Sequence, residues 1–255
     1  MTQVLWQNLT AAELRDQAKL GAIVLLPVAS TEQHGPHLTT GVDDVLCSEV
    51  CHRTALKLAD RGVPVIVAPT IAIGLAEHHM AFGGSLTLTL PTYHALLRDL
   101  CGSILRAGFS KILIVNGHGG NMSALNALTV ELTRELRAPI ATTTYWLLAD
   151  EAFAEILEDQ QSVLHACEAE TSMMMAAQPD LVDLSRLPDA LGPHASGAGS
   201  VLNRSLQRWR SFQELTPTGV IGDARRSSAE KGQRLLEAAS SALADQLALG
   251  RPWNG

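Results

Sequence analysis

Short apolar runs alternate along the chain with longer segments of helical periodicity. The runs cover 22–28, 63–69, 111–115 and 140–144, and aliphatic side chains occupy nearly every position in the first three. Such runs are typical of strands that are buried on both faces of a sheet. Helices are predicted over 10–20, from 43 or 44 to 60, over 92–107, up to about 137, from about 168, and over 228–249. This alternation indicates a largely parallel sheet that is covered by helices on both faces.

Two further segments bear on the organisation of the chain. Residues 85–90 alternate in polarity and end at Pro91, which predicts a third strand near an edge of the sheet. Residues 188–200 form a glycine-rich loop and are the one shift in composition. The amphipathic helix predicted beyond this loop needs a core to cover, and a chain of 255 residues can bury one large core. We therefore expect one domain over residues 1–255.

Composition narrows the class of protein. A hydrophobic content of 46% with 18% charged residues is typical of a globular fold. The net charge of −7 gives no basic footprint, so nucleic acid is not an expected partner. The N-terminus lacks the basic and apolar regions of a signal peptide, and no apolar segment reaches the ~20 residues that span a bilayer. We expect a cytoplasmic protein with no membrane partner and four reduced cysteines.

The first candidate chemistry follows the first predicted strand directly. The stretch 26–44 contains Glu32, His34, His37 and Asp43. Glu32 and His34 are two residues apart, so in an extended segment their side chains lie on one side. Carboxylate and imidazole at the end of a buried strand are suitable ligands for a hydrolytic metal site. A short motif of this kind also occurs by chance in polar loops, and the partner motifs further along the chain favour the metal site.

Two more clusters lie in places where such a site could draw on them. Residues 116–121 read Asn-Gly-His118-Gly-Gly-Asn and follow the strand at 111–115. Ligands gather beyond the carboxyl ends of parallel strands. A phosphate-binding loop is the competing interpretation, but the glycine patterns of such loops are absent. Residues 165–172 contain His165, Glu168 and Glu170 at the start of a predicted helix, where the two acids face the positive end of the helix dipole or serve as plain capping groups.

Taken in this order, the motifs E-Q-H-G-P-H-L with a following aspartate, N-G-H-G-G-N and H-A-x-E-x-E-T-S resemble the creatininase (creatinine amidohydrolase) family, over most of residues 20–180. The resemblance implies a three-layer α/β/α fold and a dinuclear metal centre, usually of zinc or manganese and sometimes of iron. It further implies hydrolysis of C–N bonds in cyclic or linear amides, and a homo-oligomer, a hexamer in relatives.

The resemblance also assigns roles by position. Glu32 and His118 would bind one metal, His34 the other, and Asp43 would bridge both. His165 matches the histidine that serves in proton transfer. Creatininases carry a glutamate two residues after the histidine of the N-G-H motif, where this chain has a glycine. We expect Glu168 to complete the second metal site in its place, with Glu170 as outer support or a further catalytic acid, and the converse assignment of these two acids is open.

Other departures concern the substrate. Creatininases place a tryptophan a few residues before the histidine that His165 matches, and this chain has Gln160 and Gln161 there, so creatinine is not the expected substrate. Trp146 either supplies an aromatic wall or packs in the core. His37 either supports the metal site from outside or packs in its loop. The segment from His79 to residue 85 is similar to a family loop but lacks its proline.

The expected function is therefore a metal-dependent amidohydrolase. A hydroxide held between two divalent metals would attack a small-molecule amide such as a lactam, a formamide or a peptide-like amide. The alternative is a non-catalytic relative that binds a metal or a metabolite and serves as an oligomeric scaffold. A serine hydrolase is a weaker third interpretation, because the chain has no G-x-S-x-G elbow.

Overall fold

The core of the molecule is a sheet of four parallel strands in the order β2-β1-β3-β4. The computed structural model describes residues 3–193 and 208–254. The strands are β1 (Ile23–Val28), β2 (Val65–Val67), β3 (Lys111–Asn116) and β4 (Ile140–Thr144). Each lies within a predicted apolar run or extends it by one residue. The register pairs Val28 with Asn116, so β1 and β3 end side by side and the loops beyond them begin at the same edge.

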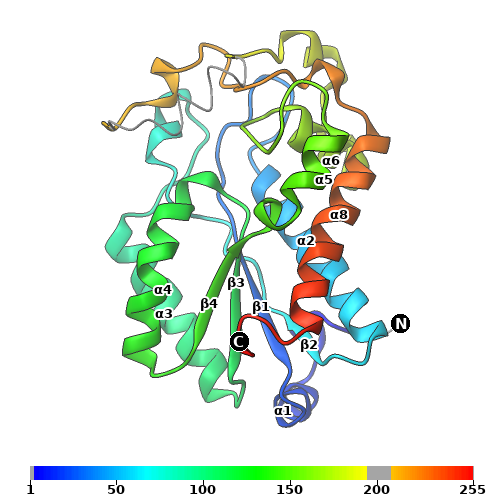
Figure 1. Cartoon of the computed structure of the whole chain (residues 1–255). Coiled ribbons are helices and arrows are strands. Elements are labelled where there is room, and N and C mark those ends of the chain that lie inside the picture. The colour runs from blue at the N-terminus through cyan, green and yellow to red at the C-terminus, as the bar shows by residue number, and fades with distance from the viewer. Residues whose placement is uncertain (1–2, 194–207, 255) are drawn as a thin grey trace.

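Helices cover both faces of this sheet, as Figure 1 shows. One face is covered by α3 (Leu90–Arg106) and α4 (Met122–Leu136), and the other by α2 (Val42–Asp60), α6 (Glu168–Ala177) and α8 (Ala229–Ala248). Val24 and Ile114 pack in the core between the sheet and α3 and α4, whereas Leu25 and Val115 pack in the core between the sheet and α2, α6 and α8. Successive side chains of a strand point to opposite faces, so a run that is apolar at every position fills two cores. The predicted three-layer α/β/α fold is confirmed.

The shorter elements lie around these layers. In the described part of the chain, the remaining α-helices are α1 (Ala11–Lys19) and α5 (Asp150–Ile156). Short 3-10 helices are η1 (Trp6–Asn8), η2 (Glu77–Phe82), η3 (Gly119–Asn121), η4 (Tyr145–Ala149), η5 (Pro179–Leu181), η6 (Leu184–Asp189), η7 (Phe212–Glu214) and η8 (Ala224–Arg226). The four cysteines are buried free thiols. Within the described ranges, no helix is both long enough and apolar enough to cross a membrane.

The strand predicted over 85–90 is wrong. Leu86 forms only an isolated antiparallel bridge with Thr31, and Leu90 already begins α3. The side chain of Thr89 accepts the backbone N–H of Thr92, and Pro91 stands in the first turn, where its missing N–H costs nothing. Local capping of a helix therefore outweighs the alternating pattern. The glycine-rich loop predicted over 188–200 falls outside the described residues from 194 onward, and the single domain stays a prediction.

Candidate metal centre

The loop after β1 turns two predicted ligands inward. Nδ1 of His34 donates to the backbone carbonyl of Glu32 at 3.1 Å, which leaves Nε2 facing Oδ1 of Asp43 at 3.2 Å. The turn continues at Gly35, which has a φ of +68°. A Cβ at position 35 would also lie 2.6 Å from Cγ2 of Val220. Both conformation and space therefore call for glycine at this turn.

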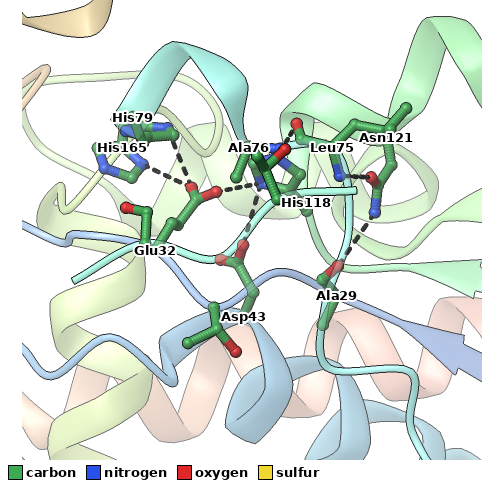
Figure 2. A network of polar contacts seen from close by, with 12 residues as sticks. Ala29, Glu32, Asp43, Leu75, Ala76, His79, His118, Asn121 and His165 are labelled. Atoms are coloured by element: carbon green, nitrogen blue, oxygen red, sulfur yellow. Dashed lines mark hydrogen bonds and ion pairs between the residues drawn. The ribbon is translucent and has the colours of Figure 1, made fainter. Parts of the chain in front are cut away.

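The loop after β3 fixes His118 through two asparagines. Oδ1 of Asn116 accepts the backbone N–H of His118 at 3.1 Å, and its Nδ2 donates to the carbonyl of His118 at 2.8 Å. Asn121 accepts the N–H of Leu75 at 3.0 Å and donates to the carbonyl of Ala29 at 3.2 Å (Figure 2). The two asparagines of the motif therefore join the loops after β1 and β3 to the segment around residue 75.

The ring of His118 is oriented in the same manner as that of His34. Its Nε2 donates to the carbonyl of Leu75 at 3.1 Å. Its Nδ1 then faces Oδ2 of Asp43 at 3.0 Å and Oε2 of Glu32 at 3.2 Å (Figure 2). Metal-binding histidines usually donate their second ring N–H to a carbonyl or carboxylate in this manner. Both rings thus present an unprotonated nitrogen to the same small volume once they are neutral.

Asp43 lies between the two histidines and faces each with a different oxygen. It comes from the first turn of α2 and is 3% exposed. Among the described residues, Oδ2 of Asp43, Oε2 of Glu32 and Nε2 of His34 have no hydrogen-bond partner beyond the contacts between acid and histidine given above. With neutral rings the facing nitrogens have no proton to donate in these contacts. A buried polar atom left without a hydrogen bond costs about 1–3 kcal/mol, so three that converge on one place fit a cation that would satisfy them together.

Charges in this cluster shift one another strongly. Burial opposes the charged form of His34, but the carboxylates of Asp43 and Glu170 outweigh it and raise its pKa to about 9. Burial also opposes the charge on Glu32, but His118 and His79 hold the pKa of that carboxyl well below its ordinary value. Strong shifts of both signs within one buried cluster are typical of functional sites.

Glu170 joins the cluster from the first turn of α6. Its Oε1 lies 3.9 Å from Nε2 of His34, and the side chain is buried. Burial, with a contribution from Asp43, raises the pKa of Glu170 to about 7, while His34 opposes this shift. The described residues contain three sets of possible metal ligands, and within each set the ligand atoms lie within 4.8 Å of one another. The sets are Glu32, Asp43 and His118; His34, Asp43 and Glu170; and Glu32, His34 and His165. The first two sets share Asp43.

Glu168 does not fit the role that we expected for it. Its Oε1 accepts from Nζ of Lys231 at 2.5 Å, and its Oε2 accepts the backbone N–H groups of Glu158 and Asp159 at 3.1 and 3.3 Å. In the described part of the chain, Glu168 belongs to none of the metal-capable sets. Residues two apart on a helix point about 200° away from each other, so only one of the two acids can face the cluster. That acid is Glu170.

His165 and His79 approach Glu32 from the opposite side to His118. Nδ1 of His165 lies 3.7 Å from Oε1 of Glu32, and Nε2 of His79 lies 3.1 Å from the same atom (Figure 2). The amide nitrogen of Gln33 lies 3.0 Å from Nδ1 of His79 and 2.9 Å from Nε2 of His165. Burial lowers the pKa of His165 well below its ordinary value, and His34 and His79 add to this shift.

Sequence reasoning missed the roles of Gln33 and His79. Gln33 stands between the predicted ligands Glu32 and His34 in the sequence. This position could have indicated that its amide contacts the histidines of the site. His79 was noted only as part of a family loop, and its contact with Glu32 depends on how η2 folds over the site.

The aromatic neighbour of the site also differs from expectation. Trp146 is buried in the core and stands edge-on to Tyr145, so it packs and does not form a wall. Phe212 of η7 supplies the wall, with ring centroids 4.2 Å from His79 and 4.9 Å from His165. Gln160 is buried and donates to the carbonyl of Ser162, in the region where creatininases carry a tryptophan.

His37 supports the site from outside. Its Nε2 lies 2.7 Å from Oγ1 of Thr171, the residue that follows Glu170 in α6. Burial lowers the pKa of His37 to about 4, and the nearby His34 adds to this shift. A neutral imidazole at this position joins the loop after β1 to the helix that carries Glu170.

Comparison with known proteins gives a consistent family. The family model described as creatinine amidohydrolase matches residues 7–247. The mycofactocin precursor peptide peptidase of Mycolicibacterium smegmatis is 30% identical over 235 residues, which are 90% of this chain and 86% of that protein. The creatinine amidohydrolase of Pseudomonas putida is 28% identical over 243 residues, or 88% of each chain. The 3-dehydro-scyllo-inosose hydrolase of Thermotoga maritima is 27% identical over 255 residues, or 93% of this chain and 80% of that protein.

Solved structures share the fold over the whole chain. A crystal structure of creatininase aligns with a TM-score of 0.83 and 25% identity, and covers 99% of both chains. Two further structures, described as a manganese creatininase and as a Zn–Zn form of a creatininase mutant, have TM-scores of 0.81 and 0.82 at 24% identity. Each covers 98 or 99% of this chain and all of its own, and at this identity they bear on the fold alone.

Proposed function

This chain belongs to the creatininase family, and we propose that it is a metal-dependent amidohydrolase that cleaves a C–N bond of a small amide. The observation that carries the proposal is the position of Asp43. Its two oxygens lie 3.2 and 3.0 Å from ring nitrogens of His34 and His118, which come from the ends of different strands. A buried carboxylate placed in this way is suited to bridge two cations.

The donor set fits two divalent ions. Glu32, Asp43 and His118 would hold one ion, and His34, Asp43 and Glu170 the other. All donors are imidazole nitrogens or carboxylate oxygens, a combination that suits zinc or manganese and also admits iron.

Position 120 explains why the acid comes from α6. Family members with a glutamate there need room for its side chain, but a Cβ at Gly120 would lie 2.4 Å from Nε2 of His118 and 2.5 Å from the carbonyl of Leu75. Real Cβ atoms essentially never approach so closely. We therefore assign the second carboxylate to Glu170, which reaches the same cluster from the opposite layer.

When bound, the ions would supply Lewis acidity, which would lower the pKa of a water toward neutrality and polarise an amide carbonyl. The remaining steps belong to the chain. His165 is buried and neutral, and Nδ1 faces the cluster, so it can accept a proton there and pass it to the leaving nitrogen. His79 donates to Oε1 of Glu32 and holds that carboxylate in place, while Phe212 covers both rings and excludes water.

The substrate is proposed at the level of its chemical class. The named substrates of the relatives include creatinine and a precursor peptide. We propose a small cyclic or linear amide, such as a lactam, a formamide or a peptide-like amide. Creatinine is not the proposed substrate, because Gln160 occupies the region of the family tryptophan. A homo-oligomer, a hexamer as in relatives, and a place in the cytoplasm also stay proposals.

Metal content and hydrolysis, measured on the same preparation, test this proposal. We expect two divalent ions per chain by elemental analysis, and loss of amide hydrolysis on chelation with recovery on addition of Zn²⁺ or Mn²⁺. Glu170→Gln should lose about one ion, whereas the matched variant Glu168→Gln should keep both. Protein without bound metal, or two ions without hydrolysis of any lactam, formamide or dipeptide in a panel, would instead favour a non-catalytic scaffold.

A further inference from the structure

A pocket of about 540 Å³ opens beside the candidate metal centre. It is lined by Gln33, Gly35, Pro36, Phe82, Arg186, Asp189, Pro217 and Thr218. Gln33 connects the two spaces, since it lines the pocket and its amide also contacts His79 and His165. Gly35 directly follows His34. An amide held at the metal centre would therefore extend past Gln33 into this pocket.

One charged pair stands in the lining of the pocket. Among its described lining residues, Arg186 is the sole cation and Asp189 the sole anion. Nε of Arg186 donates to Oδ2 of Asp189 at 3.1 Å. The terminal amino groups of Arg186 have no hydrogen-bond partner in the described part of the chain. The carboxylate of Asp189 therefore orients the guanidinium while leaving its two outer N–H groups available.

The pair belongs to a segment whose backbone is joined to the metal centre. Arg186 and Asp189 belong to η6, which begins after Asp183. The backbone N–H of Asp183 donates to the carbonyl of His37 at 2.8 Å, so η6 is joined to the loop that carries the predicted ligands. Across the pocket, Oγ1 of Thr218 donates to the carbonyl of Leu191 at 2.9 Å. The helix η6 is thus positioned beside the path of a bound amide, and its two charged side chains, 54 and 63% exposed, reach the pocket from it.

We propose that the substrate carries a carboxylate on the part that enters this pocket, and that Arg186 binds it. Two parallel N–H donors of a guanidinium match the two oxygens of a carboxylate, a geometry that a neutral group or a lysine does not reproduce. The remaining lining, with Pro36, Phe82 and Pro217, suits the short carbon skeleton between the amide and the acid. The substrate class is then an N-acyl amino acid or a short peptide with a free C-terminus. This inference rests on the proposed function and narrows it.

The test compares amides that differ only in the carboxylate. N-acetyl-L-alanine and N-ethylacetamide contain the same kind of scissile bond, and the second lacks the acid. With the metal-loaded enzyme, we expect a ratio of kcat/KM that favours the acid by on the order of 10- to 100-fold, mainly through KM. Arg186→Met should remove most of this ratio, and Arg186→Lys should restore only part of it.

A matched control exists on the other face of the sheet. Arg134 forms a similar pair with Glu131 three residues away, at 3.5 Å on the surface of α4, and Arg134→Met should leave the ratio unchanged. If Arg186→Met leaves the ratio unchanged as well, Arg186 is only a surface ion pair and the inference fails while amide hydrolysis stands. Calorimetric binding of both compounds to the metal-loaded protein keeps the test valid without turnover. Equal affinity for the acid and the neutral analogue overturns the inference, whereas failure of the proposed function shows as absent hydrolysis.

Discussion

Removing the partner of a buried carboxylate should destabilise the protein strongly. Glu168 is fully buried, and Nζ of Lys231 lies 2.5 Å from its Oε1. Lys231 comes from α8 and also contacts Glu158, which lies two residues beyond the end of α5. Lys231→Met keeps the apolar stem of the lysine but leaves the Glu168 carboxylate buried with only two backbone N–H donors.

The size of the effect follows from burial. Breaking a buried pair by removing one partner costs about 3–5 kcal/mol, and the two remaining N–H donors place this variant at about 3 kcal/mol. Glu168→Gln removes the buried negative charge, and Lys231 keeps its contact with Glu158. We therefore expect a smaller loss in the free energy of unfolding, of about 1–2 kcal/mol. The pair Lys57–Glu237, which also joins α8 to another helix, has side chains 25 and 55% exposed, and Lys57→Met should cost at most about 1 kcal/mol.

Urea unfolding of metal-free protein measures these differences without a contribution from ion binding. The midpoints should fall in the order wild type, Lys57→Met, Glu168→Gln and Lys231→Met, with unchanged m-values. If Lys231→Met unfolds no earlier than Lys57→Met, the buried pair does not support the fold as argued. If Glu168→Gln loses a bound ion, Glu168 is a ligand after all and our reassignment to Glu170 is refuted.

Three further outcomes are expected. Asp43→Ala should abolish the binding of both ions and hydrolysis, whereas His37→Ala should only weaken them, and elemental analysis showing two ions in Asp43→Ala would exclude a bridging role. Metal loading should release protons, because the pKa of about 9 keeps His34 charged at pH 7.5 in the ion-free protein, so apparent affinity should fall as the pH falls. Titration calorimetry in buffers of different ionisation enthalpy measures the number of protons released on metal binding, and release of no protons would contradict the prediction. Gly120→Ala should displace the ring of His118 and lower metal affinity at least tenfold, as measured by competition with a chelator. Unchanged affinity would show that this loop can move to accommodate the added Cβ.

Most of the fold could be predicted because its signals are local. Residues 22–28 are apolar at every position, which a strand buried on both faces requires, and Thr10 and Gly21 mark the two ends of α1. Residues 85–90 were misread because an extended linker alternates in polarity just as an edge strand does. The hydroxyl of Thr89 and the ring of Pro91 carried the better signal, since together they begin a helix.

Only those residues of the candidate site that closely follow a strand in the sequence could be predicted to lie together. Strand ends bring His34 and His118 to one edge of the sheet, and the motifs name both. The choice between Glu168 and Glu170 depends on how α6 is rotated about its axis. In the fold, Glu168 pairs with Lys231, which lies more than sixty residues along the chain from both acids and gives no local signal.

The histidines of the cluster are anchored through atoms that would not bind a metal. His34 and His118 are each held by a backbone carbonyl, of Glu32 and of Leu75, and both carbonyls belong to loops that Asn121 helps to join. None of these hydrogen bonds uses a donor atom that would bind a metal. The protein's own hydrogen bonds therefore aim the facing ring nitrogens at the Asp43 oxygens, and the electrostatic cost of gathering these groups is offset by packing and by protons that ions would replace. Binding then requires loss of protons and little rearrangement, which is the arrangement that tight, pH-dependent metal binding needs.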